Sequence, residues 1–179
     1  YKRQLQGGAA NTSIPLYRMA PDGTSLWPDG LFVSWIGGLG AVHGLANGDA
    51  LIGGYAGFSM FVTRVTSSGD EVWTAEIPVA SSSNKRLFGF VPDGNGGVYL
   101  VWDRPLAYTR MIEAMHLAET GVASWKSPTV VVPPDPSSSR HTDPVAVPDG
   151  AGGVAVIFTK GFETAGTPAP LLLQRVDPD

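Results

Sequence analysis

Six charged and aromatic side chains that could bind a ligand lie in the longer connections of this sequence: Trp35, Arg86, Arg104, Tyr108, Arg140 and His141. An arginine guanidinium offers a planar fork of N–H donors to an anion or a sugar, and a tyrosine ring can stack on a sugar. Arg104 and Tyr108 therefore predict a binding site. The alternative is a solvated loop whose charges pair with each other. Trp35 stands next to glycines, which favours either a ligand platform or burial at the centre of the fold.

The sequence holds no motif for catalysis or for a metal ion. It contains no cysteine, which excludes thiolate ligands and cysteine nucleophiles. His141 and Asp143 are two residues apart, but a metal site needs three or four converging ligands. The segment DGNGG at 93–97 lacks the spaced carboxylates and closing glutamate of a calcium loop, so a hairpin turn explains it better. We expect no catalytic residue, no metal and no cofactor.

Composition places the chain among turn-rich globular proteins. Of its 179 residues, 43% are apolar and 16% are charged, and there are 23 glycines and 15 prolines. So many helix breakers favour strands joined by tight turns. The net charge of −4 argues against nucleic acid as a partner, and no apolar run approaches the roughly 20 residues of a membrane span. A protein or a glycan is the expected partner.

Three segments of the chain repeat one pattern, in which a glycine precedes a tryptophan by four residues. The pairs are Gly23 and Trp27, Gly69 and Trp73, and Gly121 and Trp125. LLLQRVDPD at 171–179 begins a fourth copy. A second pattern falls between these copies, as VPDGNGGVYLVW at 91–102 and VPDGAGGVAVIF at 147–158. Repeated turns at a constant spacing indicate a repeat protein.

Each unit is predicted to hold four antiparallel strands. Apolar segments on both sides of a glycine-rich turn are typical of a β-hairpin, and each unit contains two such turns. In the second full unit the strands are expected at 86–91, 97–102, 110–117 and 123–132. Four repeated strands favour an all-β fold, an arc of about three β-propeller blades. A β-sandwich is the alternative, but it would not repeat the spacing from turn to tryptophan.

The predicted units divide the chain into two partial and two whole blades: 1–35 with two strands, 36–82, 83–134, and 135–179 with three strands. Propellers close with roughly four to eight blades, and an open arc leaves apolar edges that promote aggregation. We therefore expect these residues to belong to a longer propeller. The alternative is that further copies of the chain complete the ring.

The repeated tryptophans and their turn glycines are expected to be structural. Each tryptophan opens the fourth strand of its unit, where its indole can cover the hairpin and fill the space between neighbouring blades. Because the position recurs, packing explains it better than a binding platform does.

The segment LAETGVASWK at 117–126 resembles the tryptophan-docking repeat of quinoprotein-like propellers. PDGxGGVxxxW and LWPDGLFVS resemble the propeller repeats of large secreted bacterial proteins. These resemblances imply blade architecture and an extracellular, periplasmic or cell-surface location. Met115 and Leu117 replace the Ala and Asp that are usual in the quinoprotein repeat, and the cysteine pair of many quinone-binding members is missing. Cofactor binding is therefore not implied.

Connection lengths distinguish the two ends of the predicted sheets. The hairpin turns are short and similar, whereas the other connections vary in length and composition, and antiparallel strands place all of these at one end. Rigid scaffolds usually carry function on such loops. We therefore expect a non-catalytic binding or scaffold module that uses this variable-loop face. One alternative is an arc of a propeller enzyme, a quinoprotein dehydrogenase or a glycan hydrolase whose catalytic residues lie on other blades. Another is a lectin.

Overall fold

The computed structural model describes residues 15–33, 38–79, 86–106, 109–134, 141–160 and 170–177. This part of the chain consists of β-strands and contains no helix, which confirms the all-β prediction. Within it, accordingly, no helix is long and apolar enough to cross a membrane.

The strands form four antiparallel sheets that follow one another along the chain. The N-terminal pair joins β1 (Pro15–Leu16) to β2 (Leu31–Phe32). The first sheet contains β3 (Gly38–Gly44), β4 (Ala50–Ala56), β5 (Ser59–Val65) and β6 (Glu71–Pro78). The second sheet contains β7 (Arg86–Pro92), β8 (Val98–Pro105), β9 (Arg110–Leu117) and β10 (Thr129–Val132). The third sheet contains β11 (His141–Pro148), β12 (Val154–Lys160) and β13 (Leu171–Val176).

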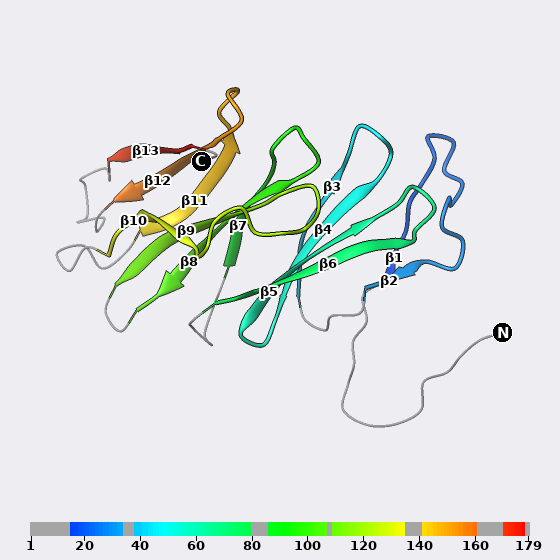
Figure 1. Cartoon of the computed structure of the whole chain (residues 1–179), viewed down its shortest axis with the longest axis horizontal. Coiled ribbons are helices and arrows are strands. Elements are labelled where there is room, and N and C mark those ends of the chain that lie inside the picture. Colours follow the sequence, from blue (N-terminus) through cyan, green and yellow to red (C-terminus); the bar gives the residue numbers. More distant parts are fainter. Residues whose placement is uncertain are drawn as a thin grey trace.

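The sheets lie side by side in chain order, like the blades of a propeller (Figure 1). In each of the three larger sheets the strands are hydrogen-bonded in sequence order. The first strands of these sheets approach each other, since β7 contacts both β3 and β11. Gly89 on β7 permits a close approach to β11, because a Cβ at this position would overlap the side chain of Ala146. Small residues therefore let the inner strands converge.

Two apolar cores hold the three larger sheets together, and both depend on the second sheet. Alternate residues of a strand point to opposite faces. Leu100 and Trp102 of β8 pack against the first sheet, whereas Tyr99 and Val101 pack against the third. The strand β8 is consequently buried on both faces and reads as a continuous apolar run, VYLVW.

The short hairpin turns gather along the upper edge of Figure 1. The turn between β7 and β8 shows why the sequence folds this way. Asp93 Oδ1 accepts hydrogen bonds from the backbone N–H groups of Asn95 (2.7 Å) and Gly97 (2.9 Å). Gly94 and Gly96 supply the positive φ angles of 83° and 90° that the turn requires. Asp149 holds the β11–β12 turn in the same way.

The fourth strand of the second sheet is shorter than predicted. The sequence predicts a strand over 123–132, but β10 covers only Thr129–Val132. Upstream, Ala123 forms an isolated bridge to Leu117, and Ser124 N–H donates to His116 O. Pro128 precedes β10 and has no N–H to donate to a ladder, so regular pairing begins after it. The expected third strand, 110–117, coincides with β9.

The position of the tryptophans also differs slightly from the prediction. Trp73 lies within β6, whereas Trp27 and Trp125 precede β2 and β10. All three nevertheless follow the turn glycine by four residues.

Candidate functional site

The variable-loop face consists of the sheet ends opposite the short turns. Its connections span 57–58, 79–85, 106–109, 133–140 and 161–170. Three of the predicted ligand-binding residues belong to strand ends on this face: Arg86 begins β7, Arg104 is the seventh residue of β8, and His141 begins β11. Trp35, Tyr108 and Arg140 lie outside the described residues.

Strand pairing brings the backbones of these residues to one region. Arg86 is the register partner of Asp103, the residue before Arg104. The strands β7 and β11 are neighbours, and both begin on the variable-loop face, so the backbone of His141 enters the same region. The prediction that these positions share a face therefore has a geometric basis in the second and third sheets.

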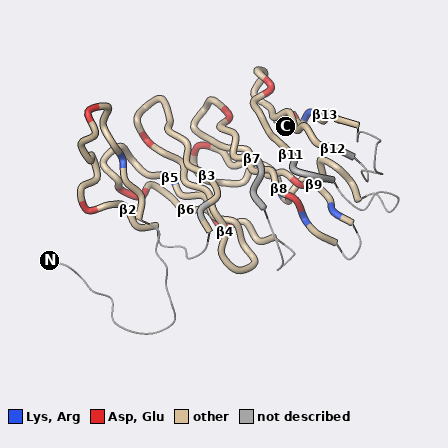
Figure 2. Tube along the Cα trace, turned by 180° about the vertical axis from the view of Figure 1, so that it is seen from behind, with Lys and Arg blue, Asp and Glu red and all other residues tan. Residues whose placement is uncertain are grey.

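Two ion pairs occupy this end of the second sheet. Toward the third sheet, Arg110 of β9 pairs with Asp103 of β8, whose side chain is only 3% exposed. Toward the first sheet, Arg104 Nε lies 3.3 Å from Glu113 Oε2, and Trp102 Nε1 donates to the same oxygen over 3.2 Å. Figure 2 shows neighbouring basic and acidic segments on β8 and β9. The charges at the base of the 106–109 loop are therefore matched within the protein.

Arg104 has protein partners on two sides. Besides Glu113, its guanidinium contacts Met111 Sδ at 2.8 Å. A ligand would have to compete with this buried carboxylate, and an unpaired buried charge is costly. The geometry favours the interpretation in which the loop charges pair with each other. Ligand binding by Arg104 stays a prediction.

Glu113 is a residue of this site that the sequence analysis missed. It stands in the apolar strand RMIEAMHL and is the register partner of Trp102. A carboxylate inside an apolar strand is the available signal, because a buried charge needs a partner on a neighbouring strand. The identity of that partner depends on register, which the sequence left open.

The opposite, short-turn face carries a repeated contact that we call the clamp. In the first clamp, Arg18 and Trp27 both donate to the carbonyl oxygen of Ser67 in the next sheet, over 2.8 and 3.1 Å. In the second clamp, Arg64 and Trp73 both donate to the carbonyl oxygen of Glu119, over 3.3 and 2.8 Å. The turn glycine beneath each indole leaves room for the ring. Each clamp thus links one sheet to the next through a basic residue and a tryptophan.

A second repeated contact joins an aspartate of the first turn to the basic residue of the third strand. The pairs are Asp49 with Arg64 (2.9 Å), Asp93 with His116 (2.9 Å) and Asp149 with Arg175 (2.5 Å). Burial raises the pKa of Asp49, but hydrogen bonds from Arg64 and Asn47 outweigh this effect and hold the pKa below its usual value. The backbone N–H of Ala151 is the main cause that lowers the pKa of Asp149, and Arg175 adds to it. Asp49 and Asp149 are therefore ionised, structural groups.

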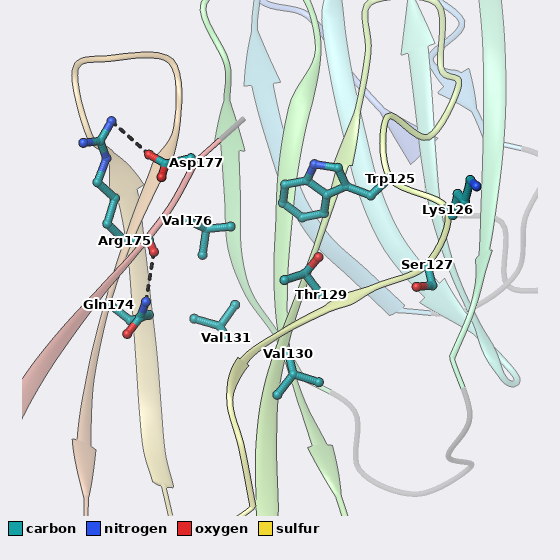
Figure 3. A pocket seen from close by; sticks show the side chains of 10 residues that line it. All are labelled: Trp125, Lys126, Ser127, Thr129, Val130, Val131, Gln174, Arg175, Val176 and Asp177. Atoms are coloured by element: carbon teal, nitrogen blue, oxygen red, sulfur yellow. Dashed lines mark hydrogen bonds and ion pairs between the residues drawn. The ribbon is translucent and has the colours of Figure 1, made fainter. Parts of the chain in front are cut away.

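An open cavity of about 520 Å³ lies between the second and third sheets, beside Trp125. Figure 3 shows Trp125 and Thr129 on one side and Gln174, Arg175 and Asp177 on the other. Arg175 on the second of these sides is engaged, since it pairs with Asp177 at 3.2 Å as well as with Asp149. The cavity therefore combines one aromatic wall with a charge-matched wall.

Among the described residues, no three His, Cys, Asp or Glu side chains converge in a way that could hold a metal ion. No protein-family model matches the chain, and no curated protein matches it. The geometry of the sheets and loops therefore carries the functional interpretation.

Proposed function

We propose that this chain is a non-catalytic binding or scaffold module of a β-propeller, and that it binds a partner protein or a glycan through its variable-loop face. The observation that carries the proposal is the contrast between the two ends of the sheets. One end repeats the same turns, aspartate pairs and clamps. At the other end the connections between the second and third strands differ from sheet to sheet, as 57–58, 106–109 and 161–170.

This contrast assigns structural support to the short-turn end of the sheets and recognition to the variable-loop end. The repeated end fixes the sheets relative to each other, so changes in the loops need not disturb the packing. Asp103 and Glu113 anchor the base of the 106–109 loop through their arginine partners. Leu106 N–H also donates to Thr109 O at 2.8 Å and closes this loop. Because the ends of the connection are held in this way, less conformational entropy is lost when it binds.

The location of the protein is part of the same proposal. The resemblance to repeats of secreted bacterial propellers supports an extracellular, periplasmic or cell-surface module. A longer propeller, of which this arc is one part, fits the same resemblance.

A loop exchange within the chain tests the proposal. The first sheet joins its second and third strands with only Gly57 and Phe58, so the same two residues can replace 106–109 in the second sheet. Binding is measured on a glycan array and with a displayed peptide library. We expect the exchanged variant to remain folded and to lose at least about tenfold in affinity for any ligand that the wild type selects.

The matched control changes the opposite face. Val122 is 66% exposed on the short-turn face, and Val122→Lys should leave binding unchanged. A ligand that binds the loop variant as well as the wild type contradicts the assignment of this face. Hydrolysis or oxidation of an arrayed glycan contradicts a non-catalytic function and favours a propeller enzyme.

A further inference from the structure

We call the interface between two successive sheets a joint. The joint between the second and third sheets differs from the two earlier joints, which link the N-terminal pair to the first sheet and the first sheet to the second. Both earlier clamps use an arginine, Arg18 or Arg64, at the basic position of the third strand. At the last joint the same repeat position holds His116. A guanidinium stays charged at all ordinary pH values, whereas histidine commonly changes charge between about pH 5 and 8.

His116 is packed on three sides. Its Nε2 lies 2.9 Å from Asp93 Oδ2, and the two side chains are only 12% and 7% exposed. Its ring stacks on Tyr99 with centroids 4.3 Å apart and an interplanar angle of 16°. Trp125 lies tilted at 6.2 Å from the imidazole. Asp93 is therefore the charged group that faces this histidine from its own sheet.

Tyr99 carries the contact onward to the third sheet. Its hydroxyl donates to Gly152 O at 2.7 Å, across the joint. Asp93, His116, Tyr99 and Gly152 thus form one continuous row from the second sheet to the third. The charged groups of the third sheet on this side are Asp149, Arg175 and Asp177, which pair among themselves.

We propose that His116 makes this joint proton-sensitive, so that the second and third sheets are held more tightly when the imidazole is protonated. The repeat itself supports the direction of the effect. Asp149, which begins its turn as Asp93 does, and Asp49, which ends the turn of the first sheet, each face a permanently charged arginine. Only a protonated His116 reproduces that arrangement. This inference is independent of the function proposed above.

The chemistry of the row supports the same direction. Oδ1 of Asp93 already accepts two backbone hydrogen bonds, and Oδ2 of the same carboxyl group faces the imidazole. A charge-assisted hydrogen bond is about twice as strong as a neutral one, and a cation attracts the face of an aromatic ring. Nδ1 opposes the change, because it is buried without a hydrogen-bond partner among the described residues. We expect the Asp93 carboxyl group and the stacked tyrosine to outweigh that cost.

Proton NMR of the histidine side chains is the first test. His43 lies exposed on β3 and serves as the internal reference. Its signal is assigned by His43→Gln and that of His116 by His116→Arg. We expect His116 to take up its proton at a higher pH than His43. Asp93→Asn should abolish this difference while keeping the turn, since Asn47 accepts a comparable turn hydrogen bond in the first sheet. Protonation of His116 at the same pH as His43, or at a lower pH, overturns the proposal.

Denaturant unfolding at pH 5.5 and pH 8 is the second test. If the fold prefers protonated His116, the stability this proton supplies is present in acid and is lost as the pH rises. We expect the unfolding equilibrium constant to rise about tenfold more between these pH values in the wild type than in His116→Arg. His43→Gln should behave like the wild type. An equal rise in wild type and His116→Arg overturns the proposal, and if that variant does not fold, Asp93→Asn decides by the same comparison.

Discussion

Single side chains at the joints explain why the repeat keeps its tryptophans. Trp27 and Trp73 each combine apolar packing with one N–H bond to a carbonyl oxygen of the next sheet. A burial role alone would be open to phenylalanine or leucine. The hydrogen bond across the joint gives the indole a role that phenylalanine and leucine cannot fill, because their side chains have no N–H donor.

Replacement of Trp27 tests this division. The residue is only 9% exposed, so Trp27→Ala should lower the free energy of unfolding by about 3–5 kcal/mol. Trp27→Phe keeps a ring but loses the N–H donor, and should cost about 1–2 kcal/mol. Urea denaturation measures both. A Trp27→Phe variant as stable as the wild type would contradict a separate role for the hydrogen bond.

Gly121 offers a sharper test, because its matched control lies in the same chain. Gly121 and Gly150 have the same φ of 79°, but a Cβ at Gly121 would lie 2.6 Å from Trp73, whereas one at Gly150 meets nothing within 4 Å. Gly150→Ala should cost about 1–2 kcal/mol from backbone strain. Gly121→Ala should cost a further 1–3 kcal/mol, roughly, from the clash. Equal losses of unfolding free energy in the two variants would mean that Trp73 can move away from the new methyl group without a cost in stability.

Asp149 predicts a dependence of stability on acid. Its pKa is lowered in the fold, so between the folded and unfolded pKa values the unfolded chain binds more protons, and stability falls as the pH falls. Wild type should therefore lose more stability than Asp149→Asn when the pH is lowered from 5 to 3. Thermal unfolding at several pH values measures the loss. The exposed Asp29→Asn is the control, and a loss in Asp149→Asn as large as in that control would contradict the assignment.

At the scale of elements, position within the arc decides how much an apolar strand is buried. The third strands β5 and β9 are mostly buried, whereas on β13 Leu171 and Leu173 are 71% and 65% exposed. In β5 and β9 a fourth strand pairs along the edge, and in the described residues β13 pairs only with β12. Sequences of similar hydrophobicity thus have different surroundings.

Lysine substitutions compare a central strand with this edge strand. Val101 of β8 lies in the core between the second and third sheets, so Val101→Lys should prevent folding or cost more than about 4 kcal/mol. Leu173→Lys should change stability by less than about 0.5 kcal/mol, since the side chain is already in water. Circular dichroism and urea denaturation distinguish the two. A large loss from Leu173→Lys would show that β13 is covered in solution.

At the scale of the whole molecule, the second sheet is the hub of the fold. Both large cores contain residues of β8 and β9, so neither outer sheet can separate without exposing part of the second. The clamps add polar links at one end of the sheets only, and apolar packing in the two cores holds the sheets together elsewhere. The first, second and third sheets should therefore unfold together, with local opening at both ends of the arc.

Hydrogen exchange should reveal this order. Amides of β8 and β9 should exchange slowest, through unfolding of the whole arc, whereas amides of β13 and of the N-terminal pair should exchange at least about 100-fold faster through local opening. Mass spectrometry of peptic fragments measures the rates. Equal protection of β13 and β8 would contradict the hub arrangement.

The sequence by itself determined the all-β fold, the hairpin turns and the four-stranded unit. These depend on local physics: positive φ at glycine, carboxylates that hold tight turns, and apolar residues on both faces of a buried strand. The range 110–117 coincides with β9 for this reason. The predicted length of β10 was wrong because regular pairing begins only after Pro128, which has no N–H to donate to a ladder.

Only the tertiary structure decided which partners meet. Register and the packing of sheets distant in sequence decide three contacts. Trp73 donates to Glu119, Glu113 pairs with Arg104, and His116 lies between Asp93 and Tyr99. A sequence pattern fixes the direction of a side chain within its strand. It does not fix the neighbour across the sheet interface, because that neighbour is set by how two complete faces pack against each other.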